Sequence, residues 1–175
     1  MAIYTFEGRV PQIGEGSFVH ELATVIGDVR IGRKCFIAPG AVLRGDYGTI
    51  ILGDGVSVED NVVIHARPGE MTKIGDRATL GHGCVIHNCE IGEDVVVGMG
   101  AVVSDYAKVG RWAVVAEGAV VKNRDVIEDE TIVAGIPAKP IGKVNEAYKE
   151  TWSKFKGIYS SLASKRYPEG LKRID

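Results

Sequence analysis

The chain has 175 residues and a formal net charge of −2, with 21 Lys and Arg against 23 Asp and Glu. Its length suits one domain with a core of its own, and 45% hydrophobic and 25% charged residues are ordinary for a soluble globular protein. A chain so close to neutral and without a basic cluster is not expected to bind nucleic acid or an anionic membrane surface.

The opening segment, the apolar runs and the cysteines together indicate a cytoplasmic protein. Glu7 and Arg9 interrupt the first residues, so they do not resemble a signal peptide. No apolar run approaches the roughly 20 residues that a membrane span needs. The three cysteines, an odd number, fit a reducing compartment better than a disulfide scaffold.

A period of six residues runs from residue 13 to residue 121, with interruptions after residues 43, 64 and 86. Its branched or long apolar positions are Ile13, Val19, Val25, Ile31, Ile37, Leu43, Leu52, Val58, Ile64, Ile74, Leu80, Ile86, Ile91, Val97, Val103, Val109, Val115 and Val121. Small residues recur four positions later, as at Ala23, Cys35 and Ala41. Glycine, 23 of the 175 residues and nearly twice its usual share, often follows the apolar position and is expected to turn tight corners.

A period of six matches neither the 3.6 residues of an α-helix nor the alternation of a long strand. It is typical of a short strand plus a corner, repeated, which builds a parallel β-helix. With three faces to a coil, about eighteen residues make one turn, and stacked coils lie about 4.8 Å apart. The sequence therefore predicts a single-stranded β-helix domain over residues 1–143, in which each apolar position points inward.

Residues 144–175 are predicted to form one amphipathic helix of about 20 residues and a tail. Asn145 is its candidate N-cap, and Pro168 and Gly170 mark its end. The face expected to pack along the β-helix consists of Tyr148, Trp152, Phe155, Tyr159 and Leu162. The predicted fold class is thus all-β with one C-terminal helix.

The repeat brings two of the four histidines together. Arg44, His65 and His87 each follow the third apolar position of successive coils, so they are expected to stack in one outward column with neighbours about 4.8 Å apart. Extra residues follow this face in two successive coils, and loops on a rigid scaffold often carry function. Two stacked imidazoles repel each other when both are protonated, so this pair needs a partner.

His82 lies one face earlier than His87, with a corner between them. Five extended residues span at most about 17 Å, and the corner turns the two side chains apart. One chain is therefore not expected to bring three imidazoles within the 2.0 to 2.1 Å of a shared metal. A neighbouring copy could supply its His82 to the pair of His65 and His87, which predicts metal sites between subunits of a threefold homo-oligomer. Three neutral imidazoles with an open position suit Zn²⁺, with Fe²⁺ or Co²⁺ as alternatives.

The other candidate ligands are weaker. Cys89, two residues after His87, is an alternative ligand, whereas Cys84 occupies an inward position and is assigned to the core. His20 is interpreted as a surface or hydrogen-bonded histidine.

The segments "LRGD", "VEDNVVIH" and "GHGCVIHNCEIG" resemble the γ-class carbonic anhydrases and related hexapeptide-repeat proteins. The opening residues and "LRGDYG" are similar to the subgroup found with phenylacetate-degradation and carnitine genes. The resemblance implies a left-handed β-helix, a homotrimer, and reversible hydration of CO₂ to bicarbonate at a metal shared across each subunit interface. It implies His65 and His87 as the ligands of one chain and His82 as the ligand from the adjacent subunit.

The resemblance also implies roles for five further residues. Arg44 and Asp46 match a pair that joins subunits and shapes the site, although a purely structural ion pair is equally expected. Asp60 matches an acidic position of the motif, and Tyr159 matches a helix tyrosine that approaches the site in some relatives. Glu59 stands where the family prototype has glutamine, and it is the expected proton acceptor or hydroxide-orienting group.

Two departures leave other functions open. Ser57 replaces an asparagine of the prototype, and the long acidic loop used there for proton transfer is reduced to a short segment with Glu70. Acyl transfer or thioester hydrolysis on a CoA substrate is the second hypothesis, because "VAGIPAKP" resembles a segment of hexapeptide-repeat acyltransferases. A catalytically silent metal-binding trimer is the third.

Overall fold

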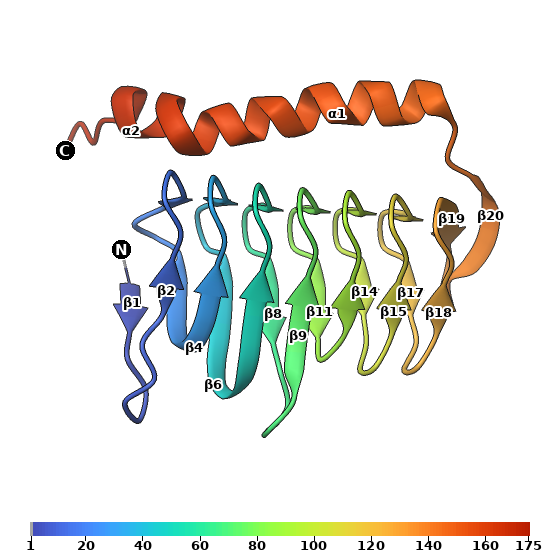
Figure 1. Ribbon diagram of the computed structural model, residues 1–175, viewed down its shortest axis with the longest axis horizontal. Coiled ribbons are helices and arrows are strands. Elements are labelled where there is room, and N and C mark those ends of the chain that lie inside the picture. The colour runs from blue at the N-terminus through green and yellow to red at the C-terminus, as the bar shows by residue number, and fades with distance from the viewer. Residues whose placement is uncertain (1) are drawn as a thin grey trace.

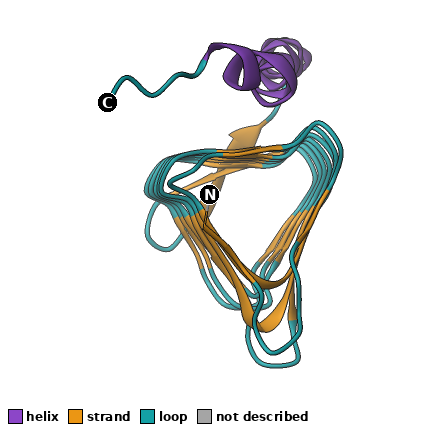
Figure 2. Ribbon diagram, turned by 90° about the vertical axis from the view of Figure 1, so that its left-hand side faces the viewer, coloured by secondary structure: helices purple, strands orange, loops and turns teal. Residues whose placement is uncertain are grey.

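The computed structural model describes residues 2–175 and shows a three-sided prism of stacked coils with a helix along one side (Figures 1 and 2). Strands of neighbouring coils pair in parallel around the prism, and β19 with β20 forms an antiparallel pair at its end. The predicted fold class, a parallel β-helix with one C-terminal helix, is confirmed.

The prism has three faces, which are called the helix face, the histidine face and the third face. The helix face, over which the C-terminal helix lies, consists of β3 (Phe18–Val19), β5 (Phe36–Ile37), β7 (Ser57–Val58), β10 (Thr79–Leu80), β13 (Val96–Val97), β16 (Val114–Val115), β19 (Thr131–Ala134) and β20 (Lys139–Lys143). The histidine face consists of β1 (Ala2–Tyr4), β8 (Val63–His65), β11 (Val85–His87), β14 (Val102–Val103) and β17 (Val120–Val121). The third face consists of β2 (Gln12–Ile13), β9 (Met71–Ile74), β12 (Glu90–Ile91), β15 (Lys108–Val109) and β18 (Val126–Ile127). The long strands β4 (Thr24–Ile31) and β6 (Val42–Leu52) run from the histidine face into the third face.

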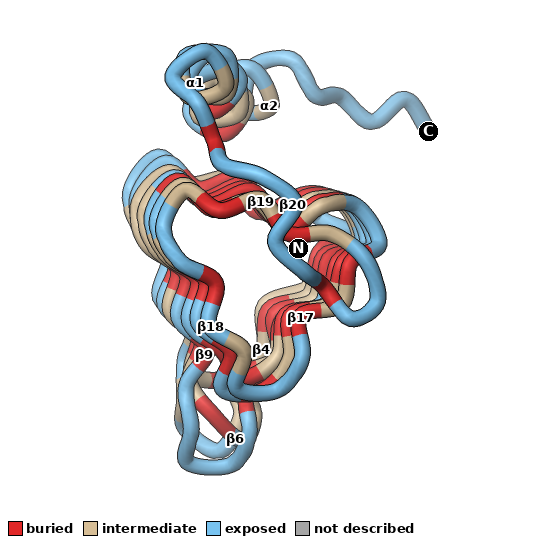
Figure 3. The backbone as a smooth tube through the Cα atoms, turned by 90° about the vertical axis from the view of Figure 1, so that its right-hand side faces the viewer, coloured by how far each residue is buried: buried red, intermediate tan, exposed pale blue. Residues whose placement is uncertain are grey.

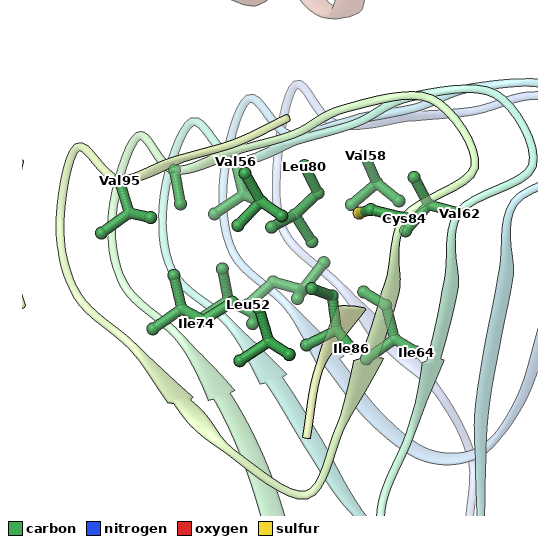
Figure 4. Close-up of a cluster of buried hydrophobic side chains, with 14 of the residues drawn as sticks. Leu52, Val56, Val58, Val62, Ile64, Ile74, Leu80, Cys84, Ile86 and Val95 are labelled. Carbon is green, nitrogen blue, oxygen red and sulfur yellow. The ribbon is translucent and has the colours of Figure 1, made fainter. Parts of the chain in front are cut away.

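The inward positions of the repeat form the core (Figures 3 and 4). Val58 and Leu80 from the helix face and Ile64 and Ile86 from the histidine face point into one shared interior and are fully buried. Each such side chain stabilises the fold by about 1.5 to 3 kcal/mol through its burial. Ile13, in the first coil, is the exception among the predicted inward residues at 39% exposed.

The C-terminal helix runs back over the helix face from the last coil toward the first (Figure 1). It begins as α1 (Glu146–Ser161), continues through a π-helical turn (Leu162–Arg166) and ends as α2 (Tyr167–Gly170). Asn145, the predicted N-cap, accepts a hydrogen bond of 2.9 Å from the backbone N–H of Tyr148. No helix in residues 2–175 is both long and apolar enough to span a membrane.

The aromatic stripe of the helix packs less completely than the sequence indicated. Phe155 is 48% exposed, whereas Lys156 is 6% exposed and is the buried residue of α1. The Lys156 ammonium donates a 2.6 Å hydrogen bond to the carbonyl of Arg77 and lies within 6 Å of the ring centres of Trp112 and Trp152, at 5.8 and 5.7 Å. The prediction that Phe155 faces the prism is therefore wrong, because the helix is turned so that Lys156 faces it.

The coils bulge at the edge between the histidine face and the third face. β6 passes through "RGDYG", and residues 66–70 form a loop between β8 and β9, so both project beyond the prism (Figure 1). A Cβ atom at Gly45 would lie 2.6 Å from the carbonyl oxygen of Asp28, an approach that only glycine allows. Gly45 thus holds Arg44 and Asp46 close to the neighbouring coil and beside the histidine column.

Candidate metal centre

Two imidazoles meet on the histidine face. β8 and β11 pair in parallel with His65 opposite His87, and Arg44 lies opposite His65 on the other side. The ring centres of the two histidines are 5.2 Å apart, and Nδ1 of His65 lies 3.1 Å from Nε2 of His87. The column that the repeat predicted is therefore present, and it brings two ring nitrogens into direct contact.

The outer nitrogen of each ring faces a carboxylate. Nε2 of His65 lies 3.1 Å from Oδ1 of Asp46, and Nδ1 of His87 lies 2.6 Å from Oδ1 of Asp105. A carboxylate oxygen accepts hydrogen bonds, so each outer nitrogen carries the N–H of its ring. When both rings are neutral, their inner nitrogens present lone pairs to each other. The repulsion between these lone pairs is relieved by a proton that the two rings share in a hydrogen bond or by a metal ion.

A metal ion fits this position. Two ligands of a tetrahedral Zn²⁺ at 2.0 to 2.1 Å are about 3.3 Å apart, close to the 3.1 Å between the inner nitrogens of His65 and His87. Metal-binding histidines typically donate their other N–H to a carboxylate, as both rings do here. Burial lowers the pKa of His65 even though the hydrogen bond with Asp46 opposes this, which favours the neutral, ligating form over a second bound proton.

Arg44 and Asp46 flank the pair. Nη1 of Arg44 donates a 2.6 Å hydrogen bond to Oδ2 of Asp46. Burial raises the pKa of Asp46, but the hydrogen bonds from Arg44 and His65 outweigh it and lower the pKa overall. Asp46 is thus an ionised acceptor that fixes the ring of His65, and Arg44 holds Asp46 in place.

His82 lies elsewhere, at the corner where the helix face turns into the histidine face. It follows β10, its side chain is 50% exposed, and its Nδ1 lies 2.7 Å from Oδ2 of Asp60. Within residues 2–175, the donor atoms of His82, Asp60 and Glu59 lie within 4.8 Å of one another. The fold therefore places His82 with these carboxylates, apart from the other two histidines.

Glu59 is a buried carboxylate at this corner. It is 4% exposed and accepts a short hydrogen bond from the Ser57 hydroxyl. Its column of equivalent positions begins with His20 and otherwise contains the small residues Ala38, Gly81, Gly98 and Ala116. Burial raises its pKa, while Ser57 and then His82 act in the opposite direction.

Tyr159 packs beside the same corner from the helix. It is half-buried against the cluster of Phe36, Ala38 and Ala163. Burial raises its pKa, and the negative charges of Glu59 and Asp60 add to that rise. The phenol therefore stays protonated near these carboxylates.

The structure assigns the remaining candidates to other places. Cys89 and Cys84 are both buried in the core, and burial raises the pKa of each thiol to about 12, which disfavours the thiolate that a metal would bind. His20 is 8% exposed, and its Nδ1 accepts a 3.1 Å hydrogen bond from the N–H of Leu22. Glu70 is exposed in the loop that follows β8.

Two residues at the site were missed from the sequence. Asp105 binds both His87 and Arg67, and Nη2 of Arg67 donates a 2.7 Å hydrogen bond to its Oδ2. The hydrogen bond from Arg67 is the main reason that the pKa of Asp105 is lowered, and His87 adds to the effect. In the next coil the position equivalent to His87 is Ser104, and Asp105 follows it directly, so the only signal in the sequence was a carboxylate one position beyond the histidine column.

Comparisons with known proteins agree with the fold. The model of the bacterial transferase hexapeptide family (six repeats) matches residues 11–45, 71–105 and 88–123. The carnitine operon protein CaiE of Escherichia coli K12 is 37% identical over 146 residues, 83% of this chain and 74% of CaiE.

Two solved structures cover nearly the whole chain. A Bacillus cereus protein assigned as an acetyltransferase has a TM-score of 0.93 at 29% identity, over 98% of both chains. A hexapeptide transferase family protein from Anaplasma phagocytophilum has a TM-score of 0.88 at 32% identity, over 93% of this chain and 96% of that one. These matches support the left-handed sense of the β-helix that the resemblance implies.

Proposed function

Because the chain belongs to the bacterial transferase hexapeptide family, whose members commonly form homotrimers, we propose that three copies assemble around shared metal sites and catalyse the reversible hydration of CO₂ to bicarbonate. The proposal is supported chiefly by the pair of His65 and His87, whose inner nitrogens are 3.1 Å apart while both outer nitrogens are held by carboxylates. The similarity to CaiE agrees with the carnitine-operon subgroup that the motifs resemble.

The third ligand of the proposed site is His82 of an adjacent copy. Its Nδ1 is engaged by Asp60, which leaves Nε2 free to bind a metal, and half of its side chain is exposed. Met99, which follows His82 in the next coil, is 54% exposed, and Val63 and Val85 beside the histidine column are 39% and 37% exposed. These apolar residues on both sides favour burial against a second copy.

In the proposed reaction the metal ion would activate a water molecule, and residues of the chain would accept the proton and orient the ligands. Zn²⁺ bound at such a site lowers the pKa of a coordinated water to about 7 and so supplies a nucleophile at neutral pH. Hydration of CO₂ releases one proton for each bicarbonate formed, and Glu59 is the proposed acceptor because its raised pKa suits reversible proton uptake. Asp46 and Asp60 orient the rings of His65 and His82.

Hydrolysis or transfer of an acyl group from CoA is the second candidate. The Bacillus cereus relative assigned as an acetyltransferase favours it. Acyltransferases of this fold use a single histidine as the base, whereas here two histidines face each other with both outer nitrogens engaged. A hydrolase could use the same metal site, so acyl-CoA hydrolysis is the stronger form of this alternative.

The test is stopped-flow CO₂ hydration by the zinc-loaded trimer, repeated with Fe²⁺ under anaerobic conditions. Hydration that depends on the metal and disappears in His87→Ala is the expected result. The His20→Gln variant is the control, because His20 lies outside the site. Metal bound at one ion per subunit without hydration in either form would contradict the proposal, and turnover of acyl-CoA under the same conditions would establish the alternative.

A further inference from the structure

We propose that Asp105 and Arg67 form a positioning pair that fixes the ring of His87 with its Nε2 lone pair toward the metal position. This inference rests on the proposed function, since it gives the pair a role only at a site where His87 is a ligand. It goes beyond that function because neither residue lies in the sequence motifs on which the resemblance to the γ-class carbonic anhydrases rests.

Each oxygen of the Asp105 carboxylate is engaged by a neighbouring side chain. Oδ1 lies 2.6 Å from Nδ1 of His87, and Oδ2 accepts the 2.7 Å hydrogen bond from Arg67. Asp105 is 7% exposed, so water competes little for either oxygen. Because the Asp105 carboxylate can only accept, the ring of His87 must keep its proton on Nδ1.

Arg67 is itself held by the chain around the two histidines. The backbone N–H of Arg67 donates a 3.1 Å hydrogen bond to the side-chain Oδ1 of Asn88. The backbone N–H of Asn88 in turn donates a 2.9 Å hydrogen bond to the Thr72 hydroxyl. That hydroxyl donates a 2.6 Å hydrogen bond to the carbonyl of His65. Asn88 and Thr72 are buried, so the network links the residues that follow His65 to the residue that follows His87.

A purely structural role is the rival explanation, because the prism uses the same pairing elsewhere. Arg77 donates two hydrogen bonds to Asp94, at 3.0 and 2.7 Å, and Asp94 is 5% exposed. That pair holds a corner of the prism and touches no histidine. Asp94→Asn is therefore the matched control for Asp105→Asn: it removes the same charge from the same kind of ion pair.

The Asp105→Asn variant changes what His87 can do. An asparagine that accepts from Arg67 through its oxygen presents its amide N–H₂ to His87. Nδ1 must then accept, and the ring proton moves to Nε2, the nitrogen that would bind the metal. The affinity for Zn²⁺ is expected to fall by about 10- to 100-fold, the usual cost of losing such a partner.

Two measurements test the pair. The first is the affinity for Zn²⁺ by competition with a chromophoric chelator, for the wild-type protein, Asp105→Asn, Asp94→Asn and His87→Ala. The second is long-range ¹H–¹⁵N NMR of the histidine rings in the metal-free protein, which reports the tautomer of His87. The expected result is weaker binding and a changed tautomer in Asp105→Asn, with both quantities unchanged in Asp94→Asn.

The outcomes separate this inference from the proposed function. If Asp105→Asn and Asp94→Asn lower the melting temperature alike while Zn²⁺ affinity and the His87 tautomer stay as in the wild type, the pair is structural and the inference is wrong. If the wild type and His87→Ala bind Zn²⁺ equally, the proposed metal site is wrong, and the NMR result still decides whether Asp105 sets the tautomer of His87.

Discussion

Glu59 is a carboxylate that is almost fully shielded from water, and the equivalent positions in the two adjacent coils are Ala38 and Gly81. If it accepts the proton released by hydration, Glu59→Gln should lower the rate of CO₂ hydration by about 100-fold with metal content unchanged, because glutamine keeps the hydrogen bond from Ser57 but cannot take a proton. Stopped-flow assays in imidazole buffer should restore most of the rate, since a small base in solution can replace the lost acceptor. Glu90→Gln, which removes an exposed carboxylate from the third face, is the control.

Failure of imidazole to rescue Glu59→Gln would assign Glu59 a different task, that of orienting the reacting water. An unchanged rate in the variant would remove Glu59 from the mechanism. Because burial raises the pKa of Glu59, the wild-type rate should also lose its Glu59-dependent part as the pH falls through that raised value, and the glutamine variant should lack this part of the profile.

The sequence predicted the centre of the site better than its surroundings. The stacking of His65 on His87 followed from the spacing alone, because two residues at equal positions in successive coils must be neighbours. Asp105 lies in the next coil but one position beyond this column, which continues through Ser104, so the spacing that predicts the stacked histidines does not predict its contact with His87. Arg67 lies in an inserted loop outside the repeat, so its partner could only be found in three dimensions.

At the scale of the elements, the period of six fixed which strand residues are buried, whereas the helix was predicted less well. The same inward position recurs in every coil, so the assignment of a buried residue in one coil is supported by the equivalent residues of the neighbouring coils. The helix has no such repetition. A stripe of aromatic residues at helical spacing left its rotation open, and the buried position belongs to Lys156 while Phe155 is half exposed.

The position of Lys156 predicts a pH-dependent stability. Burial lowers its pKa from 10.5 to about 8, so between these values the folded state has released a proton that the unfolded chain still binds. The contribution of Lys156 to the free energy of unfolding should therefore rise with pH across this window, by on the order of 3 kcal/mol. Burial also raises the pKa of the three cysteine thiols above 9.0, so their contribution to the free energy of unfolding falls as the pH rises past that value. The contribution of Lys156 is therefore measured as the difference between the wild type and Lys156→Met in denaturant unfolding from about pH 7 to about pH 9, and this difference should rise with pH.

The matched control for this pH dependence is Lys154→Met, which removes an exposed lysine from the same helix. It should keep the full pH dependence, because Lys154 is exposed on the helix and Lys156 remains buried. A pH dependence in Lys156→Met equal to that of the wild type would show that burial of this ammonium costs little.

At the scale of the whole molecule, the histidine face carries an outward row of valines in register, Val42, Val63, Val85, Val102 and Val120. The row runs beside the histidine column, and in a single copy its members Val63 and Val85 are more than one-third exposed. The third face instead carries the charges Lys73, Glu90 and Lys108 at corresponding outward positions. This difference favours the histidine face as the surface on which copies of the chain meet.

Val85→Glu is expected to dissociate the proposed trimer, because it would bury an unpaired carboxylate between copies. Analytical ultracentrifugation should show monomers, and the affinity for Zn²⁺ should fall with dissociation, since His82 of the adjacent copy would be lost from the site. Val126→Glu, at a residue of the third face that is 69% exposed, should change neither quantity. A trimer that survives Val85→Glu would place the interface elsewhere. Monomers that bind Zn²⁺ as tightly as the wild type would show that His65 and His87 need no ligand from a second copy.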